Sequence, residues 1–194
     1  MKYDLLLILC YFCRMKNTNW IVITGAPCSG KTKVLERLSF LGYKVYPEIS
    51  RILIDNLASN NVNIEDYIAN KVNLENDILS LKLQLEKRTN EKEIYFFDRG
   101  MIDSYAFMKY YNVNMSNFET FLSHRYKHIF FLESVPYEID KYRFEKKEQI
   151  EQISSEIRQA YKKYNYPIID IPLLPIDKRV ELIINKIYKY AYQY

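Results

Sequence analysis

Eight consecutive residues have the types and the spacing of a phosphate-binding loop: Gly25, Ala26, Pro27, Cys28, Ser29, Gly30, Lys31 and Thr32. The two glycines allow the backbone to curl, so that several N–H groups point at phosphate oxygens. Lys31 is then placed to reach the β- and γ-phosphates of a nucleotide, and the Thr32 hydroxyl to bind the Mg²⁺ that bridges them. Because the chain has only 4 glycines, this spacing followed by Lys-Thr favours nucleotide binding over an ordinary turn.

The segments on either side of this loop must position it. Residues 20–24 form an apolar run that predicts a strand, and residues 33–40 have the pattern of a helix. A strand before the loop and a helix after it are the context that a P-loop requires. The helix also directs its partly positive N-terminus at the phosphates. We therefore expect all eight loop residues to contact a nucleotide.

Four further apolar runs predict additional strands, at residues 43–46, 94–97, 128–132 and 167–171. Helical periodicity extends over residues 50–88, 149–164 and 175–190. The polar stretch around Asn60 and Asn61 is expected to divide the first of these into two or more helices. Five strands alternating with helices predict an α/β chain with a three-layer P-loop NTPase fold and a mostly parallel five-stranded sheet.

Acidic side chains follow two of the predicted strands. Glu48 comes just after the second strand and Asp98 directly after the third. Because ligands of such sheets bind at the carboxyl ends of the strands, both side chains are expected beside the phosphate-binding loop. A carboxylate at Asp98 can hold Mg²⁺ directly or through water, opposite Thr32. Capping of the next helix by Asp98 is the alternative, and it is compatible with a metal role.

Composition indicates one globular domain. With 194 residues and 48% hydrophobic content, we assign residues 15–194 to a single P-loop kinase-like domain and treat residues 1–14 as a possible extension outside the fold. The net charge is +4, and the basic residues alternate with acidic ones rather than forming a block. Neither nucleic acid nor a membrane is therefore indicated as a partner. The 3 cysteines suggest no disulfide framework, and a cytoplasmic location fits this best.

Three segments together resemble the NadR-type AAA family of kinase-like P-loop ATPases. They are residues 23–32, the group of Pro47, Glu48 and Arg51, and residues 96–106, which begin Phe-Phe-Asp-Arg-Gly. This family includes the ribosylnicotinamide kinase domain of NadR and is related in layout to deoxyribonucleoside kinases. The resemblance covers residues from about 16 to 188. It implies a nucleoside- or nucleotide-kinase-like fold that uses ATP with Mg²⁺.

The resemblance also implies roles at the acceptor side of the site. In the related nucleoside kinases an acidic residue after the second strand acts as the base toward the substrate hydroxyl, and Glu48 is the matching position here. Asp98 is the rival for this role. A glutamate near its ordinary pKa could accept the proton late, since phosphoryl transfer mainly needs an oriented nucleophile and neutralised charge.

Four more residues are candidates for substrate binding. Arg51 and Arg99 would donate hydrogen bonds to an anionic or hydroxyl-rich substrate. Asp103 follows Arg99 by one helical turn and could orient it or bind a ribose hydroxyl. Gln84 resembles a recurrent family glutamine that faces the substrate, although an exposed helical glutamine is an equal alternative.

Two segments are expected near the nucleotide. Residues 142–147 follow the fourth strand, where kinase-like P-loop proteins carry a lid, and Arg143 could close over the γ-phosphate. The loop that contains Pro172 and Leu174 resembles the one that packs on the nucleotide base. Because no guanine-recognition motif is present, ATP is the expected nucleotide, with GTP left open.

Three functions fit these features. The first is a kinase that transfers the γ-phosphoryl group of Mg-ATP to a hydroxyl of a nucleoside-like small molecule. The second is a nucleotide-dependent binding module, or a slow NTPase, that acts on a protein or lipid partner. The third, a polynucleotide kinase, would need a basic channel, and the sequence has no block of basic residues to build one.

Overall fold

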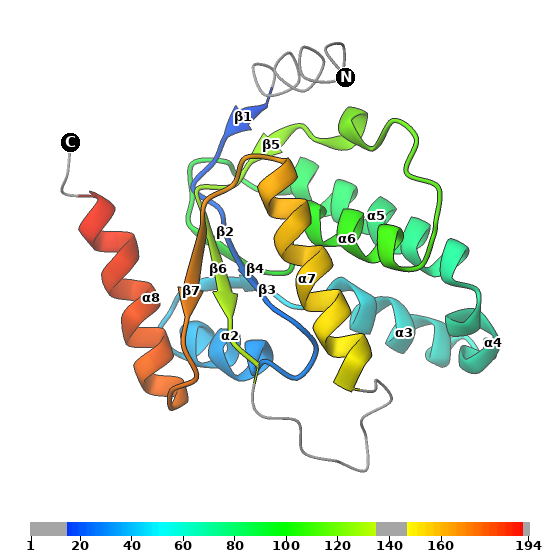
Figure 1. Ribbon diagram of the computed structural model, residues 1–194, viewed down its shortest axis with the longest axis horizontal. Coiled ribbons are helices and arrows are strands. Elements are labelled where there is room, and N and C mark those ends of the chain that lie inside the picture. The colour runs from blue at the N-terminus through cyan, green and yellow to red at the C-terminus, as the bar shows by residue number, and fades with distance from the viewer. Residues whose placement is uncertain (1–14, 135–146, 192–194) are drawn as a thin grey trace.

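The computed structural model describes residues 15–134 and 147–191, and a five-stranded sheet lies at its centre (Figure 1). The strands lie in the order β3 (Lys44–Tyr46), β4 (Tyr95–Asp98), β2 (Ile21–Thr24), β6 (His128–Leu132) and β7 (Ile168–Ile171). All four neighbouring pairs are parallel. The sheet is thus parallel throughout, where the sequence predicted a mostly parallel one. Between strands the chain returns through a helical connection to the end of the sheet where the previous strand began.

Helices cover both faces of this sheet, and the three-layer prediction is confirmed. The described α-helices are α2 (Lys31–Phe40), α3 (Ile49–Ser59), α4 (Ile64–Ala69), α5 (Lys71–Arg88), α6 (Met101–Tyr110), α7 (Lys147–Lys163) and α8 (Ile176–Ala191). One apolar cluster joins the sheet to α2 and α8, and a second joins it to α5, α6 and α7. The central strand β2 is buried at every position, which explains its uninterrupted apolar sequence.

The long helical stretch predicted over residues 50–88 forms three helices, as expected for a stretch with a polar break. After α3 the backbone turns at Asn61, whose φ of 57° lies in the left-handed region. The side chain of Asn63 then accepts a hydrogen bond from the Glu65 backbone and caps α4. Asn70 caps α5 in the same way.

Some local structure has no signal in the sequence. The two-residue strands β1 (Lys16–Asn17) and β5 (His124–Arg125) form a second, parallel sheet, and η1 (Phe118–Phe121) is a short 3₁₀ helix just before β5. Elements this short leave no readable periodicity. Met15 is buried in the core, whereas residues 1–14 lie outside the described part. Among the helices that are described, none has the length and apolarity needed to cross a membrane.

Candidate active site

The predicted phosphate-binding loop connects β2 to α2, and two glycines determine its shape. Gly25 has φ 144° and Gly30 has φ 83°, both values that side chains disfavour. A Cβ atom at Gly25 would also lie 2.6 Å from the carbonyl oxygen of Leu132 on β6. Helix α2 begins at Lys31, two residues earlier than its sequence pattern suggested, so Lys31 and Thr32 lie in its first turn.

The Lys31 side chain is folded back onto this loop. Its Nζ donates to the Ala26 carbonyl at 2.9 Å and to Ser29 Oγ at 3.2 Å. Burial, together with the nearby positive charge of Arg99, lowers the pKa of Lys31 to about 8. A buried ammonium group with neutral partners is a strong donor for an incoming anion such as a phosphate.

Arg179, on the first turn of α8, supports the loop from the other side. It is buried, and its guanidinium donates to the carbonyls of Ser29 at 2.7 Å and Glu133 at 3.1 Å. Sequence reasoning missed this residue because 150 positions separate it from Ser29 and no motif relates the two. The contact links the last helix to the phosphate-binding loop.

Glu48 and Arg99 form the second part of the site, and the fold brings them together as expected. Arg99 Nε donates to Glu48 Oε1 at 3.1 Å, and Arg99 Nη1 donates to the Gly25 carbonyl at 3.0 Å. Arg99 is buried and lies with φ 66° in the left-handed region, which non-glycine residues seldom adopt. One guanidinium group therefore joins the acidic residue after β3 to the first residue of the phosphate-binding loop.

The pKa values of the two carboxyl groups at this site, Glu48 and Asp98, are shifted in opposite directions. Burial alone would raise the pKa of Glu48, but the charges of Arg99 and Lys31 outweigh it and lower that pKa. The pKa of Asp98 is raised to about 6, first by burial and then by the negative charge of Glu48. Glu48 is therefore more acidic than an ordinary glutamate, which corrects the expectation of an ordinary pKa.

The oxygen atoms of Asp98 and Thr32 have the chemistry that a divalent cation requires. Within the described residues, the buried Asp98 Oδ1 has no hydrogen-bond partner. Buried carboxylate oxygens are normally paired, so this atom is available for a ligand. Carboxylate and hydroxyl oxygens are the hard donors that Mg²⁺ prefers. The described residues contain no cluster of three or more His, Cys, Asp or Glu side chains that could hold a metal ion, at this site or elsewhere.

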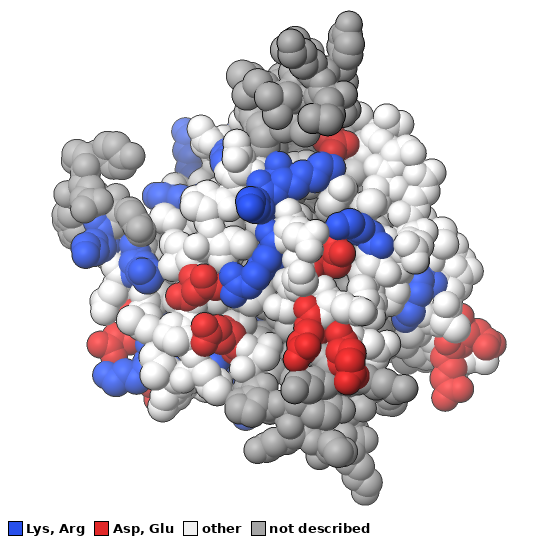
Figure 2. All heavy atoms as spheres, viewed as in Figure 1, with Lys and Arg blue, Asp and Glu red and all other residues white. Residues whose placement is uncertain are grey.

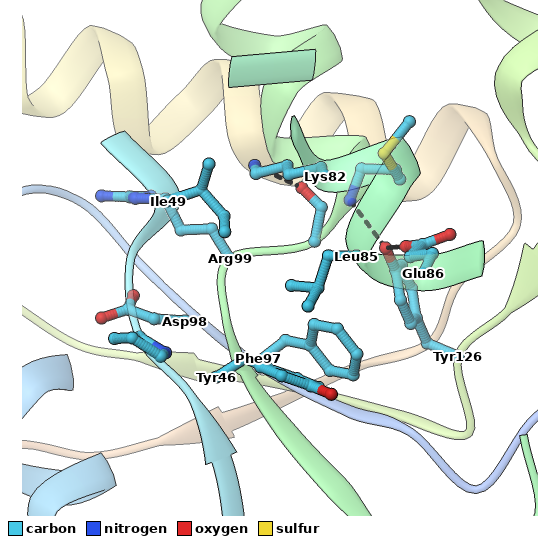
Figure 3. A pocket seen from close by; sticks show the side chains of 12 residues that line it. Tyr46, Ile49, Lys82, Leu85, Glu86, Phe97, Asp98, Arg99 and Tyr126 are labelled. Carbon is cyan, nitrogen blue, oxygen red and sulfur yellow. Dashed lines mark hydrogen bonds between the residues drawn. The ribbon is translucent and has the colours of Figure 1, made fainter. Parts of the chain in front are cut away.

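A narrow pocket lies behind the Glu48 side of the site, between β3, α5 and the start of α6 (Figure 3). Its walls include the aromatic rings of Tyr46, Phe97 and Tyr126, and Asp98 and Arg99 lie beside them. The free space is about 10 Å³, which is close to the room that one water molecule needs. An acceptor larger than water would have to widen this pocket.

Two charged residues of α5 are buried although no sequence motif marks them, and one of them lines this pocket. The buried Lys82 donates from Nζ to the Gly100 carbonyl at 2.8 Å and to Ser104 Oγ at 2.9 Å. The first of these bonds is drawn in Figure 3. Glu75 lies on the buried face of the same helix, and burial raises the pKa of its carboxyl group to about 7. Helical periodicity marks both as positions on a buried stripe, but their charges hid that signal.

The other predicted residues take different positions. Arg51 is exposed and pairs with Glu48 Oε2 at 3.4 Å, whereas Gln84 is exposed on α5. Asp103 is fully buried on α6, where its partners are protein groups. Pro172 and Leu174 are exposed in the loop between β7 and α8. The predicted lid residue Arg143 lies outside the described residues.

Charge on the molecular surface is mixed. Figure 2 shows both basic and acidic side chains on the face it presents, with a group of basic side chains across its upper middle and most of the acidic ones below. Several basic residues of α6 and α7 are paired, as in Lys109 with Glu156 at 2.7 Å and Arg158 with Asp170 at 2.6 Å. Such pairing leaves little uncompensated positive charge there for a nucleic-acid backbone.

Solved structures with the same fold include several that are kinases by name. Deoxyadenosine kinase from M. mycoides superposes with a TM-score of 0.61 at 18% identity, over 88% of this chain and 99% of that one. Thymidylate kinase from Ehrlichia chaffeensis gives 0.63 at 14% identity, over 89% and 100%. The NadR protein gives 0.66 at 14% identity, over 94% of this chain and 53% of NadR. At these identities the similarity concerns the fold.

A search of curated protein sequences found no match. A sequence profile described as an AAA domain does match, over residues 20–179, which include the phosphate-binding loop, Glu48, Asp98 and Arg179. The resemblance predicted from the motifs is therefore confirmed, and the chain belongs to this AAA domain family, with the fold of the P-loop kinases.

Proposed function

We propose that this protein is a phosphotransferase that moves the γ-phosphoryl group of Mg-ATP to a hydroxyl of a small, nucleoside-like molecule. The observation that carries the proposal is the position of Arg99. Its guanidinium bonds to Glu48 at 3.1 Å and to the Gly25 carbonyl at 3.0 Å. A candidate base and a phosphate-binding loop are thereby held as one unit, as transfer between two bound substrates requires.

The nucleotide would bind along residues 25–32. In the proposed complex, Lys31 exchanges its contacts with loop carbonyls for contacts with the β- and γ-phosphates. Thr32 and Asp98 would hold Mg²⁺, which when bound neutralises charge on the transferred phosphoryl group. We assign Arg143 to the closing lid and Pro172 and Leu174 to contacts with the base, both as predictions from the sequence.

The acceptor would bind on the side of Glu48. Its hydroxyl oxygen forms the new bond to the γ-phosphorus, the bond from that phosphorus to the bridging oxygen of ADP breaks, and Glu48 takes the hydroxyl proton. A lowered pKa keeps Glu48 ionised at neutral pH. That makes it a modest base, which suits a transition state in which the proton leaves late. Arg51 and Gln84 are assigned to acceptor contacts.

The names of similar structures support a small acceptor. Deoxyadenosine kinase, thymidylate kinase and shikimate kinase share the fold, and each is named for a small molecule. They differ in acceptor class, so the acceptor of this protein has to be found by experiment. ATP is the first nucleotide to try, and a cytoplasmic location is the corresponding expectation.

The test is release of ADP above the baseline without acceptor, measured with Mg-ATP and a panel of nucleosides, ribosides and nucleoside monophosphates. Loss of a general base typically costs 10²–10⁴ in rate, so Glu48→Gln should lower acceptor-dependent turnover by about 100-fold or more. Asp98→Asn should do the same if it holds the metal. Glu93→Gln, which changes an exposed carboxylate paired with Lys44, is the matched control.

Full turnover by folded Glu48→Gln and Asp98→Asn proteins would contradict the proposal. Tight binding of ATP with slow hydrolysis that no acceptor stimulates would contradict it too. That second result would favour a nucleotide-dependent binding module.

A further inference from the structure

The Asp103 carboxylate lies at the centre of a hydrogen-bond network with no contact to solvent. Its Oδ2 accepts from the Tyr161 hydroxyl at 2.6 Å and from the Gly100 backbone N–H at 2.8 Å. Its Oδ1 accepts from the Thr24 hydroxyl and faces Arg99 Nη1 at 3.5 Å. Asp103, Thr24 and Tyr161 are each fully buried. Four donors thus converge on one carboxylate immediately behind the candidate active site.

Tyr161 brings a third element into this network. It lies on α7, 58 residues from Asp103 in the sequence, and no motif marks it. Burial, and then the charge of Asp103, raise the pKa of its hydroxyl well above 10. The hydroxyl therefore keeps its proton and acts as a permanent donor to the carboxylate.

The network supports a strained turn. Arg99 has φ 66°, and the backbone N–H groups on both sides of its Cα are held: Arg99 N–H bonds to the Ile23 carbonyl at 3.1 Å, and Gly100 N–H bonds to Asp103. Lys82 holds the Gly100 carbonyl. A non-glycine residue keeps such a conformation only where its surroundings over-determine it. The direction of the Arg99 side chain therefore depends on partners that do not themselves reach the Glu48 carboxylate.

We propose that Tyr161 and Asp103 are positioning residues, which fix the Arg99 guanidinium in the place where it holds Glu48 and the Gly25 carbonyl. The hydroxyl of Tyr161 orients the Asp103 carboxylate, and this carboxylate fixes both the turn at Gly100 and the far edge of the guanidinium. The inference rests on the proposed function only where it concerns turnover. Its structural part, that Arg99 depends on Tyr161, can be tested without any substrate.

A plain structural role is the alternative, since the same bond joins α6 to α7. The chain offers a matched control for it. Tyr164 follows the last residue of the same helix, is likewise buried, and donates its hydroxyl to the Glu119 carboxylate at 2.9 Å. Tyr161→Phe and Tyr164→Phe therefore each remove one hydroxyl-to-carboxylate bond of a buried tyrosine, but only the first touches the network of Arg99.

The first measurement uses the substrate-free protein and the NMR signal of the Arg99 Nε–H group, assigned with Arg99→Lys. In the wild type this N–H bonds to Glu48, so its hydrogen should exchange slowly with water. We expect Tyr161→Phe and Asp103→Asn to speed that exchange about tenfold or more and to move the signal. Tyr164→Phe should leave both the rate and the position unchanged.

The second measurement is turnover with the acceptor that the panel identifies. Tyr161→Phe should lower kcat about tenfold and leave the dissociation constant of Mg-ATP within about threefold, since the Tyr161 hydroxyl bonds to Asp103 rather than to the loop of residues 25–32. Tyr164→Phe should change neither value.

The two measurements together distinguish the positioning role of Tyr161 from the proposed phosphotransferase function. If Tyr161→Phe behaves as Tyr164→Phe does in both measurements, the positioning role is wrong and the bond only joins two helices. If the Arg99 signal responds but the wild type phosphorylates no acceptor, the proposed function fails while the positioning of Arg99 by Tyr161 stands. If Tyr161→Phe changes both the Arg99 signal and the turnover, the positioning role and the proposed function are both supported.

Discussion

Among single residues, Lys31 provides the site with a buried positive charge that a phosphate ligand can bind. Its ammonium group is buried among neutral oxygens, and burial lowers its pKa to about 8. A buried cation whose hydrogen-bond partners are neutral is costly to the folded protein, and the nearby charges of Asp98 and Glu48 offset only part of that cost. The same group gains strong, charge-assisted bonds once phosphates arrive.

Replacement of Lys31 should therefore separate binding from stability. We expect Lys31→Met to weaken Mg-ATP binding about 100-fold or more, because a bond to a charged group contributes about 1.5–3 kcal/mol and the phosphates offer several. The unfolding free energy of the nucleotide-free protein should stay the same or rise. Calorimetric titration and urea unfolding measure the two quantities. The exposed neighbour Lys33→Met is the control, and equal ATP affinity in both variants would contradict the assignment.

Among the structural elements, the connection from β2 to α2 depends most on one residue type. At Gly25 a side chain meets both an unfavourable φ of 144° and a backbone oxygen 2.6 Å away. At Gly42, after α2, φ is 89° but nothing lies within 4 Å of the added Cβ. Substitutions at Gly42 and Gly25 therefore distinguish the cost of backbone strain alone from the cost of strain combined with a steric collision.

We expect Gly42→Ala to cost only about 1–2 kcal/mol of stability, the usual strain of a left-handed residue. Gly25→Ala should cost clearly more and should also abolish nucleotide binding, since the Leu132 carbonyl belongs to the sheet and cannot move away. Urea unfolding and ATP titration of both variants check this. Equal losses in the two proteins would show that the collision at Gly25 is relieved.

Helices α3 and α4 are the least buried of the described helices. Neither has a fully buried residue, whereas α2 and α6 each bury several. The pocket at the start of α3 has room for about one water molecule. We expect their amide hydrogens to exchange at least tenfold faster than those of α6, and an acceptor to slow them. Hydrogen exchange with mass spectrometry tests this, and equal protection of all four helices would contradict it.

The sequence predicts local features of this site well and long-range features poorly. The loop at residues 25–32 and the carboxylates Glu48 and Asp98 were predictable because each follows a strand by a fixed, short spacing. The partners Tyr161 and Arg179 were not, since they reach the site from positions 58 and 150 residues away through packing alone. Patterns of hydrophobicity locate such helices but do not show which polar side chain points inward.

For the molecule as a whole, Glu75 makes stability depend on pH. It is buried, and burial raises its pKa from 4.5 to about 7 despite the charges of Lys82 and Lys71. The folded state therefore holds a proton that the unfolded chain releases between these two values. The contribution is fully present below pH 4.5 and is lost as the pH rises through 7.

Glu75→Gln should accordingly be more stable than the wild type at pH 8, by up to about 3 kcal/mol, and equally stable near pH 4.5. The exposed Glu36→Gln is the matched control and should show no such trend. Urea unfolding of the three proteins across this pH range measures the difference. A constant difference between wild type and Glu75→Gln would mean that Glu75 does not keep its proton in the fold.

The central claim is that the γ-phosphoryl group passes to a small-molecule hydroxyl and not to water. The most direct test incubates the protein with ATP labelled by ³²P at the γ-position, Mg²⁺ and each member of the acceptor panel, and then separates the labelled products. We expect label in an organic phosphate with the wild type and its loss with Glu48→Gln. Label found only in inorganic phosphate, or left in ATP with every acceptor, would contradict the account.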